Sequence, residues 1–95
     1  ELLRISAMAA AYDIPVVPHG SGVYSYHFVI TQPHCPFCEY LNSSPDCASF
    51  PPVFGNMFEN EEGPTDGRIR LSDEPGWGLK LNRNNIKLVR PYPTQ

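Results

Sequence analysis

The chain has 95 residues, a formal net charge of −3 and 41% hydrophobic residues. This composition fits one small folded unit and excludes a wholly disordered chain. Lys and Arg are scattered singly, so the sequence contains no basic stripe for nucleic acid. No apolar run reaches the roughly 18–20 residues that a membrane span needs, and the first residues lack the pattern of a secretory signal. We therefore expect no nucleic-acid partner and no membrane.

Proline and cysteine usage add two expectations. Eleven prolines are spread along the chain, and because each one interrupts helices and strands, the elements should be short. Three cysteines are an odd number, which argues against the disulfide framework of a small secreted protein. We therefore predict free thiols and a reducing, cytoplasmic location.

Two helices are predicted in the first third of the chain. Residues 2–12 repeat apolar side chains at three-to-four spacing, as one face of a helix does, and no N-cap residue precedes them. Residues 22–31 predict the second helix, with Ser21 as its N-cap and Pro33 just beyond its end.

Between these helices, residues 14–18 predict a buried strand. Ile14 to Val17 are apolar on successive positions, which is typical of strands in parallel sheets. A single parallel strand has no partner, and no further strand–helix unit follows it. We therefore expect the helix–strand–helix segment to be the last turn of a larger α/β sheet or barrel.

The remainder of the chain predicts short strands and long loops. Residues 39–41 and 68–71 have strand patterns, whereas residues 51–66 are rich in Pro, Gly, Asn and Glu and predict a surface meander. Trp77 lies in a turn sequence and should pack against a neighbour. The acidic residues of this region are typical of solvated turns; they are Glu59, Glu61, Glu62, Asp66 and Asp73.

His19 is the strongest candidate for chemistry. It lies between Pro18 and Gly20, where the predicted strand ends and the chain turns. In α/β barrels the catalytic groups project from the carboxyl ends of the strands. An imidazole has a reference pKa of about 6.5, which suits proton transfer at neutral pH. A histidine that is hydrogen-bonded to a loop carbonyl is the alternative, and the pattern alone leaves both open.

Cys35 and Cys38 form a CxxC pair with two further interpretations. Such a pair can open the helix of a redox protein, or it can supply half of a zinc site with Cys47 and with His27 or His34. The following loop would end any helix within one turn, and no second pair completes a zinc site. Free thiols are the default. A small zinc-binding or other non-enzymatic module is the alternative function.

Glu39 follows the pair inside an otherwise apolar run, Phe37 to Leu41. A carboxylate in such a run is costly unless it is paired or used. If the run is an exposed edge, the cost vanishes, and the sequence leaves both possibilities open.

Several segments together carry a family resemblance. They are Ile14-Pro-Val-Val-Pro-His-Gly-Ser21, Val23-Tyr-Ser-Tyr-His-Phe28, Pro36-Phe-Cys-Glu-Tyr-Leu41 and, in the tail, Pro75-Gly-Trp-Gly-Leu79. With these segments, the chain resembles the C-terminal portion of the sugar-acid dehydratases of the enolase superfamily. The specific feature is a Val-Pro-His-Gly segment with a glutamate twenty residues after the histidine, whereas the Pro-Gly-x-Gly tail is shared more widely.

The resemblance implies an α/β fold: the C-terminal part of a (β/α)7β TIM-like barrel, plus the C-terminal contribution to an α+β capping domain. Residues 1–37 would end the barrel, with residues 14–18 as its eighth strand, and residues 38–95 would return to the capping domain. A barrel of this kind takes roughly 250 residues. Most of it would therefore belong to a longer parent enzyme, expected to be a homo-oligomer.

The resemblance also implies a reaction. A base removes the proton next to the carboxylate of an acid sugar, Mg²⁺ stabilises the enediolate, and the neighbouring hydroxyl leaves as water. By resemblance, His19 is the general base and then the general acid. Glu39 binds the substrate and stabilises the transition state, for which its carboxyl must be protonated. The metal ligands and the Asp that orients the histidine are expected outside this chain, which alone should be inactive.

Overall fold

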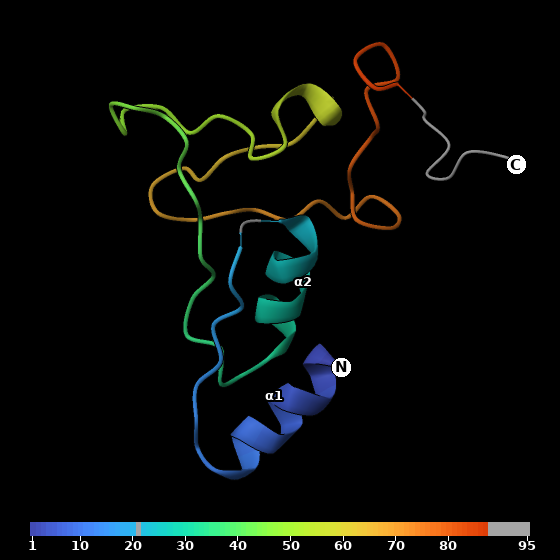
Figure 1. Cartoon of the computed structure of the whole chain (residues 1–95). Helices are drawn as coiled ribbons and strands as arrows, with labels where there is room; N and C mark the ends of the chain where they lie inside the picture. The colour runs from blue at the N-terminus through green and yellow to red at the C-terminus, as the bar shows by residue number, and fades with distance from the viewer. Residues whose placement is uncertain (21, 88–95) are drawn as a thin grey trace, which may run out of the picture.

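The computed structural model describes residues 1–20 and 22–87, and its first element is α1, Leu2–Ala11 (Figure 1). Four of its ten residues are alanine, the strongest helix former. The helix ends at Tyr12, and Asp13 follows with a left-handed φ of 54°. The N–H of Ile14 then donates to the Ala9 carbonyl at 2.9 Å, which satisfies one of the last free carbonyls of the helix. The helix predicted over residues 2–12 is confirmed.

The second helix, α2, spans Val23–Thr31 and follows Gly22, whose backbone is extended. It ends at Gln32, where φ is −114° and ψ is 109°. This extended conformation is the one that a following proline imposes, and Pro33 follows. The predicted helix and its end are therefore confirmed, whereas the predicted N-cap, Ser21, lies outside the described residues.

The strand predicted over residues 14–18 does not form in the described chain. The segment has no sheet ladder, and a 3.3 Å hydrogen bond from the Val16 N–H to the His34 carbonyl ties it to the chain after α2. The reason is physical: a parallel strand is held by neighbours along its edges, and residues 1–20 and 22–87 contribute no such neighbour. Residues 14–18 connect α1 to α2, as predicted, but they do not pair with another strand.

Most of residues 43–87 form a loop-rich layer near the end of the molecule where α2 begins (Figure 1). The helical turn η1, Gly55–Met57, lies within it. An isolated antiparallel bridge joins Phe58 to Leu81, and a 2.9 Å backbone hydrogen bond on either side extends the pairing. Two segments that are distant in the sequence are thereby held together.

The strands predicted over residues 39–41 and 68–71 are also wrong for the described part of the chain. The first has no bridge partner there, and the second contributes an isolated bridge between Thr65 and Arg68 across a tight turn. An alternating pattern forms a strand only where another edge lies within hydrogen-bond reach, and the described chain brings none to these segments.

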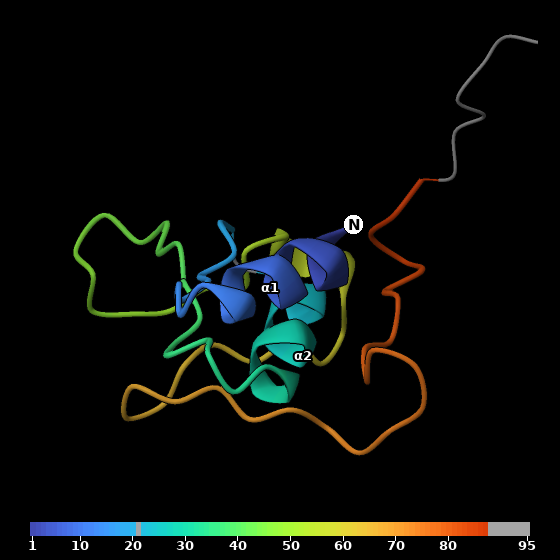
Figure 2. The same cartoon turned by 90° about the horizontal axis from the view of Figure 1, so that it is seen from below.

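A polar contact ties α1 to the chain that leaves α2, and the two helices are neighbours in the fold (Figures 1 and 2). Ser6 of α1 is completely buried. Its hydroxyl donates to Oε1 of Gln32 at 2.8 Å and lies 3.1 Å from Nε2 of His34. The hydroxyl has one proton, so the imidazole must donate in the second bond. This contact fixes α1 against the chain that leaves α2.

The described chain has a small apolar core. Tyr26 and Phe28 of α2 are its buried hydrophobic residues. Many large apolar side chains are exposed instead, among them Leu3, Ile5, Met8, Tyr12 and Ile30. No helix among the described residues is long and apolar enough to cross a membrane.

Candidate active site

His19 lies on a bend directly after residues 14–18, where the sequence predicts the functional end of a strand. Gly20 follows it with a φ of 98°, a conformation that side chains with a Cβ rarely adopt. The His19 side chain is 85% exposed. Gly20 thus allows a sharp turn that presents the imidazole to solvent.

The side chains of His19 and Glu39 meet. Nδ1 of His19 lies 2.9 Å from Oε2 of Glu39, and the backbone N–H of Gly20 donates to the same oxygen. An ionised carboxylate can only accept, so Nδ1 carries the proton, and Nε2 holds the lone pair when the ring is neutral. Both predicted site residues therefore belong to one constellation, with Nε2 as its basic nitrogen. The Gly20 N–H is a third member that the sequence does not reveal.

The surroundings of Glu39 keep its carboxyl ionised. The hydrogen bond from the Gly20 N–H lowers its pKa most, partial burial acts in the opposite direction, and the hydrogen bond and charge of His19 lower it further. In the described chain, the shift of this pKa is therefore opposite to the one that a protonated Glu39 requires. Its reason lies in the donors: an N–H and an imidazole outweigh the apolar neighbours that the sequence places around this residue.

The cysteines do not assemble into a reactive or metal-binding site. All three are free, as predicted; Cys35 and Cys38 are half-buried and Cys47 is exposed. Burial raises the pKa of the Cys35 thiol, whereas a reactive cysteine needs a lowered one. In the described ranges no three His, Cys, Asp or Glu side chains are grouped so that they could hold a metal ion. The geometry supports neither the redox nor the zinc interpretation.

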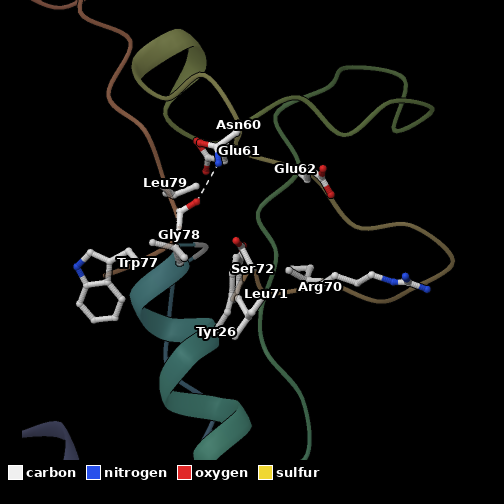
Figure 3. A pocket seen from close by; sticks show the side chains of 12 residues that line it. Tyr26, Asn60, Glu61, Glu62, Arg70, Leu71, Ser72, Trp77, Gly78 and Leu79 are labelled. Atoms are coloured by element: carbon white, nitrogen blue, oxygen red, sulfur yellow. Dashed lines mark hydrogen bonds between the residues drawn. The ribbon is translucent and has the colours of Figure 1, made fainter. Parts of the chain in front are cut away.

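A separate hollow of about 270 Å³ opens between the first turns of α2 and the tail (Figure 3). Tyr26, Trp77 and Leu79 contribute its apolar and aromatic walls, and Asn60 and Glu61 contribute polar ones. Trp77 also packs edge-on against the ring of His27, with the ring centroids 5.4 Å apart, so its predicted contact with a neighbour is confirmed.

Glu61 is not the solvated turn residue that the sequence predicts. Its Oε2 is buried and has no hydrogen-bond partner among the described residues. Burial raises the pKa of this carboxyl. The sequence contains no signal that separates Glu61 from Glu59 and Glu62, because all three lie in one polar stretch and the fold alone decides which is enclosed.

Comparison with known proteins identifies the family to which this geometry belongs. The profile of enolase C-terminal domain-like proteins matches residues 1–85. The chain belongs to the enolase C-terminal domain-like family. The resemblance predicted from the sequence is thereby confirmed, and so is the enolase C-terminal domain-like character of the fold.

Members of this enolase family with a known name or structure are similar over nearly the whole chain. An L-rhamnonate dehydratase of Saccharopolyspora erythraea is 48% identical over 92 residues, which cover 97% of this chain and 23% of the relative. The crystal structure of L-rhamnonate dehydratase from Gibberella zeae matches with a TM-score of 0.81 and 56% identity over 88% of this chain. A second structure of the Gibberella zeae enzyme, in complex with Mg, matches with a TM-score of 0.80 and 55% identity.

The chain is much shorter than these members of the enolase family. It spans between a fifth and a quarter of the length of the curated relatives that it matches, and 21–22% of the two solved chains. The comparisons therefore concern one segment of relatives that are several times longer than this chain.

Proposed function

We propose that this chain is the C-terminal segment of an acid-sugar dehydratase, and that L-rhamnonate is its substrate. One observation carries the proposal: the imidazole of His19 and the carboxylate of Glu39 meet at 2.9 Å, within a chain about half identical to L-rhamnonate dehydratases. An imidazole held by the Glu39 carboxylate can accept a proton. Such an acceptor suits the removal of the proton on the carbon next to the carboxylate of the substrate.

In this proposal, residues 1–37 end a (β/α)7β barrel and residues 38–95 contribute to its capping domain. The absence of a ladder along residues 14–18 supports this division, because the segment would acquire its edge partners from the rest of the barrel. The apolar side chains that α1 exposes would be covered in the same way. The cytoplasmic location and the homo-oligomeric state belong to the same proposal.

The proposed chemistry begins at Nε2 of His19. The nitrogen takes the proton from C2 of L-rhamnonate, and the C–H electron pair moves into the enediolate of the carboxyl group. The C3–O bond then breaks, and the protonated His19 returns its proton to the leaving hydroxyl as water. The resulting enol becomes the 2-keto-3-deoxy acid. In the described chain, the ionised Glu39 accepts a hydrogen bond from Nδ1 and thereby leaves Nε2 as the acceptor.

The Mg²⁺ of this proposal would be held by residues outside this chain. Among the described residues no three His, Cys, Asp or Glu side chains are grouped so that they could hold a metal ion, and His19 and Glu39 contact each other instead. The transition-state role of Glu39 needs a protonated carboxyl, so we infer that the rest of the enzyme must bury this residue further before it can donate to substrate.

The test is turnover by the longer protein. With L-rhamnonate and a panel of its stereoisomers as substrates, we expect a 2-keto-3-deoxy acid and water from the longer protein in the presence of Mg²⁺. The purified 95-residue chain should form no product under the same conditions. Failure of the longer protein to dehydrate any acid sugar would contradict the proposed function. Turnover by the 95-residue chain would contradict the proposal that the active site needs residues outside this chain.

A further inference from the structure

The hollow beside α2 is lined by Glu61, and one oxygen of its carboxylate has no counterpart in the described chain. Oε2 of Glu61 is buried and has no hydrogen-bond partner among the described residues. An isolated buried carboxylate is costly, because water no longer solvates its charge and nothing replaces that water. Glu61 is at the same time one of the residues that line an open hollow.

The charged and titratable groups around Glu61 do not neutralise it. Glu62 lines the same hollow and has the same sign of charge. Arg70 also lines it, but its guanidinium extends away from the hollow (Figure 3). Tyr40 is neutral; burial raises its pKa, and the charge of Glu61 raises it further. His27 of α2 packs on Trp77 and has a buried Nε2 that is itself without a hydrogen-bond partner in the described chain.

The remaining walls suit a planar cation. Tyr26 and Trp77 contribute two aromatic side chains, and Trp77 is 56% exposed. A guanidinium can stack on an aromatic face while it donates two parallel hydrogen bonds to a carboxylate. A lysine ammonium lacks that planar fork and is more strongly hydrated, so an arginine fits the combination better.

We propose that this hollow receives an arginine side chain from the part of the parent enzyme that lies outside this chain. The negative charge of Glu61 requires an incoming side chain with a positive charge, and the aromatic walls favour one with a planar charged group. The volume of about 270 Å³ suits one side chain and falls below the size of most small-molecule sites. The inference rests on the proposal that this chain is part of a longer protein, whose relatives extend well beyond the matched segment. Glu61 is then an anchor between the tail and that remaining polypeptide.

The test compares Glu61→Gln with Glu62→Gln in the longer protein, by thermal unfolding between pH 7 and pH 4. Glutamine keeps the shape of Glu61 but removes its charge. At pH 7 we expect Glu61→Gln to lower the Tm by at least about 5 °C, since it leaves a buried cation unpaired. Glu62→Gln, on the same hollow, should leave the Tm almost unchanged.

The direction of the pH dependence decides between the outcomes. A carboxylate paired with a cation has a folded-state pKa below its unfolded one, so its contribution is present at pH 7 and is lost as the pH falls. The Tm gap between wild type and Glu61→Gln should therefore narrow towards pH 4. An unpaired Glu61 predicts the opposite. The Tm of Glu61→Gln would then be at least that of wild type at pH 7, and the Tm of wild type would rise relative to that of the variant as the pH falls. That result, or a gap that does not change with pH, would overturn the inference.

Glu61→Asp keeps the test decisive if the glutamine variant does not fold. It retains the charge with a shorter reach and should therefore lose less stability than Glu61→Gln. An aspartate that also fails to fold, or that loses as much as the glutamine, would count against a charge pair. Because every readout is unfolding rather than turnover, the inference can fail while the dehydratase activity stands, and the reverse is also true.

Discussion

Oε2 of Glu39 receives donors from two neighbouring residues of the bend, the Gly20 N–H and the His19 ring. The backbone donor is available because Gly20 has a φ of 98°. A residue with a Cβ would be strained in that conformation and would tend to move the imidazole away from the carboxylate. The position of the proposed base thus depends on a glycine that takes no part in the chemistry.

The lowered pKa of Glu39 predicts a pH-dependent contribution to stability. A carboxyl whose folded pKa lies below its ordinary value of 4.5 stabilises the fold above that pH, and the contribution is lost as the pH falls through the folded pKa. In the 95-residue chain, Glu39→Gln should therefore unfold at lower urea concentration than wild type at pH 7. The difference should shrink between pH 5 and pH 3, as a series of urea titrations would show.

The matched control is Glu74→Gln, on an exposed turn. It should change the urea midpoint little at any pH. A Glu39→Gln variant as stable as wild type at pH 7 would show that its two donors do not favour the ionised form.

At the residue scale, the structure brings together the two side chains that the sequence singles out, and the pKa of one of them shifts in an unexpected direction. The strand-end position identifies His19, and the cost of a carboxylate in an apolar run identifies Glu39. The protonation of Glu39 and the burial of Glu61 could not be predicted. The first depends on contacts of Glu39 with residues about twenty positions earlier in the chain. The second depends on the enclosure of Glu61 by α2 and the tail, and no local sequence pattern encodes either.

Among the elements, the contact between α1 and the chain after α2 depends on one hydroxyl. Ser6 is completely buried, donates to Gln32 and accepts from His34. Such a bond adds direction to the contact between α1, whose large apolar side chains are exposed, and the chain after α2. We infer that Ser6 fixes the angle at which α1 meets the rest of the segment.

Ser6→Ala should therefore destabilise the longer protein by about 1–3 kcal/mol, because it leaves two polar side chains without their partner. Chemical denaturation measures this loss as a shift of the unfolding midpoint. Ser43→Ala, at an exposed position, is the control and should shift it little. Equal midpoints for Ser6→Ala and wild type would show that Gln32 and His34 find other partners.

The predicted helices formed and the predicted strands did not, and the difference has one cause. A helix satisfies its backbone hydrogen bonds within itself, so a periodic sequence such as residues 2–12 suffices to specify it. A strand satisfies them on a neighbour, and residues 1–20 and 22–87 bring no neighbour to residues 14–18. The apolar run predicts a strand of a larger sheet, and the described residues form no such sheet.

The whole molecule is more extended than its length would require. Its Cα radius of gyration is 16.1 Å, whereas a compact domain of this length would have about 12–13 Å. Tyr26 and Phe28 are the buried apolar residues of the described chain, and the loop-rich layer extends well beyond the two helices (Figure 1). This shape agrees with a segment whose apolar surfaces and unpaired backbone are completed by additional polypeptide.

At this scale the family was predictable from short motifs, and the architecture was predictable only by resemblance. The composition indicated a small folded unit, but the described residues form an open arrangement with little core of their own. Motifs persist in a segment, whereas a core requires all of the layers that enclose it. The central claim is that this segment supplies the base of a larger active site.

The most direct test of that claim is the exchange of the C2 proton of L-rhamnonate with solvent deuterium, measured by NMR with His19→Asn in the longer protein. We predict that exchange and dehydration fall by about 10²-fold or more, while circular dichroism shows an unchanged fold. His34→Asn, which changes a histidine bonded to Ser6, should retain both activities. Exchange at the wild-type rate in a folded His19→Asn protein would show that another group removes the proton.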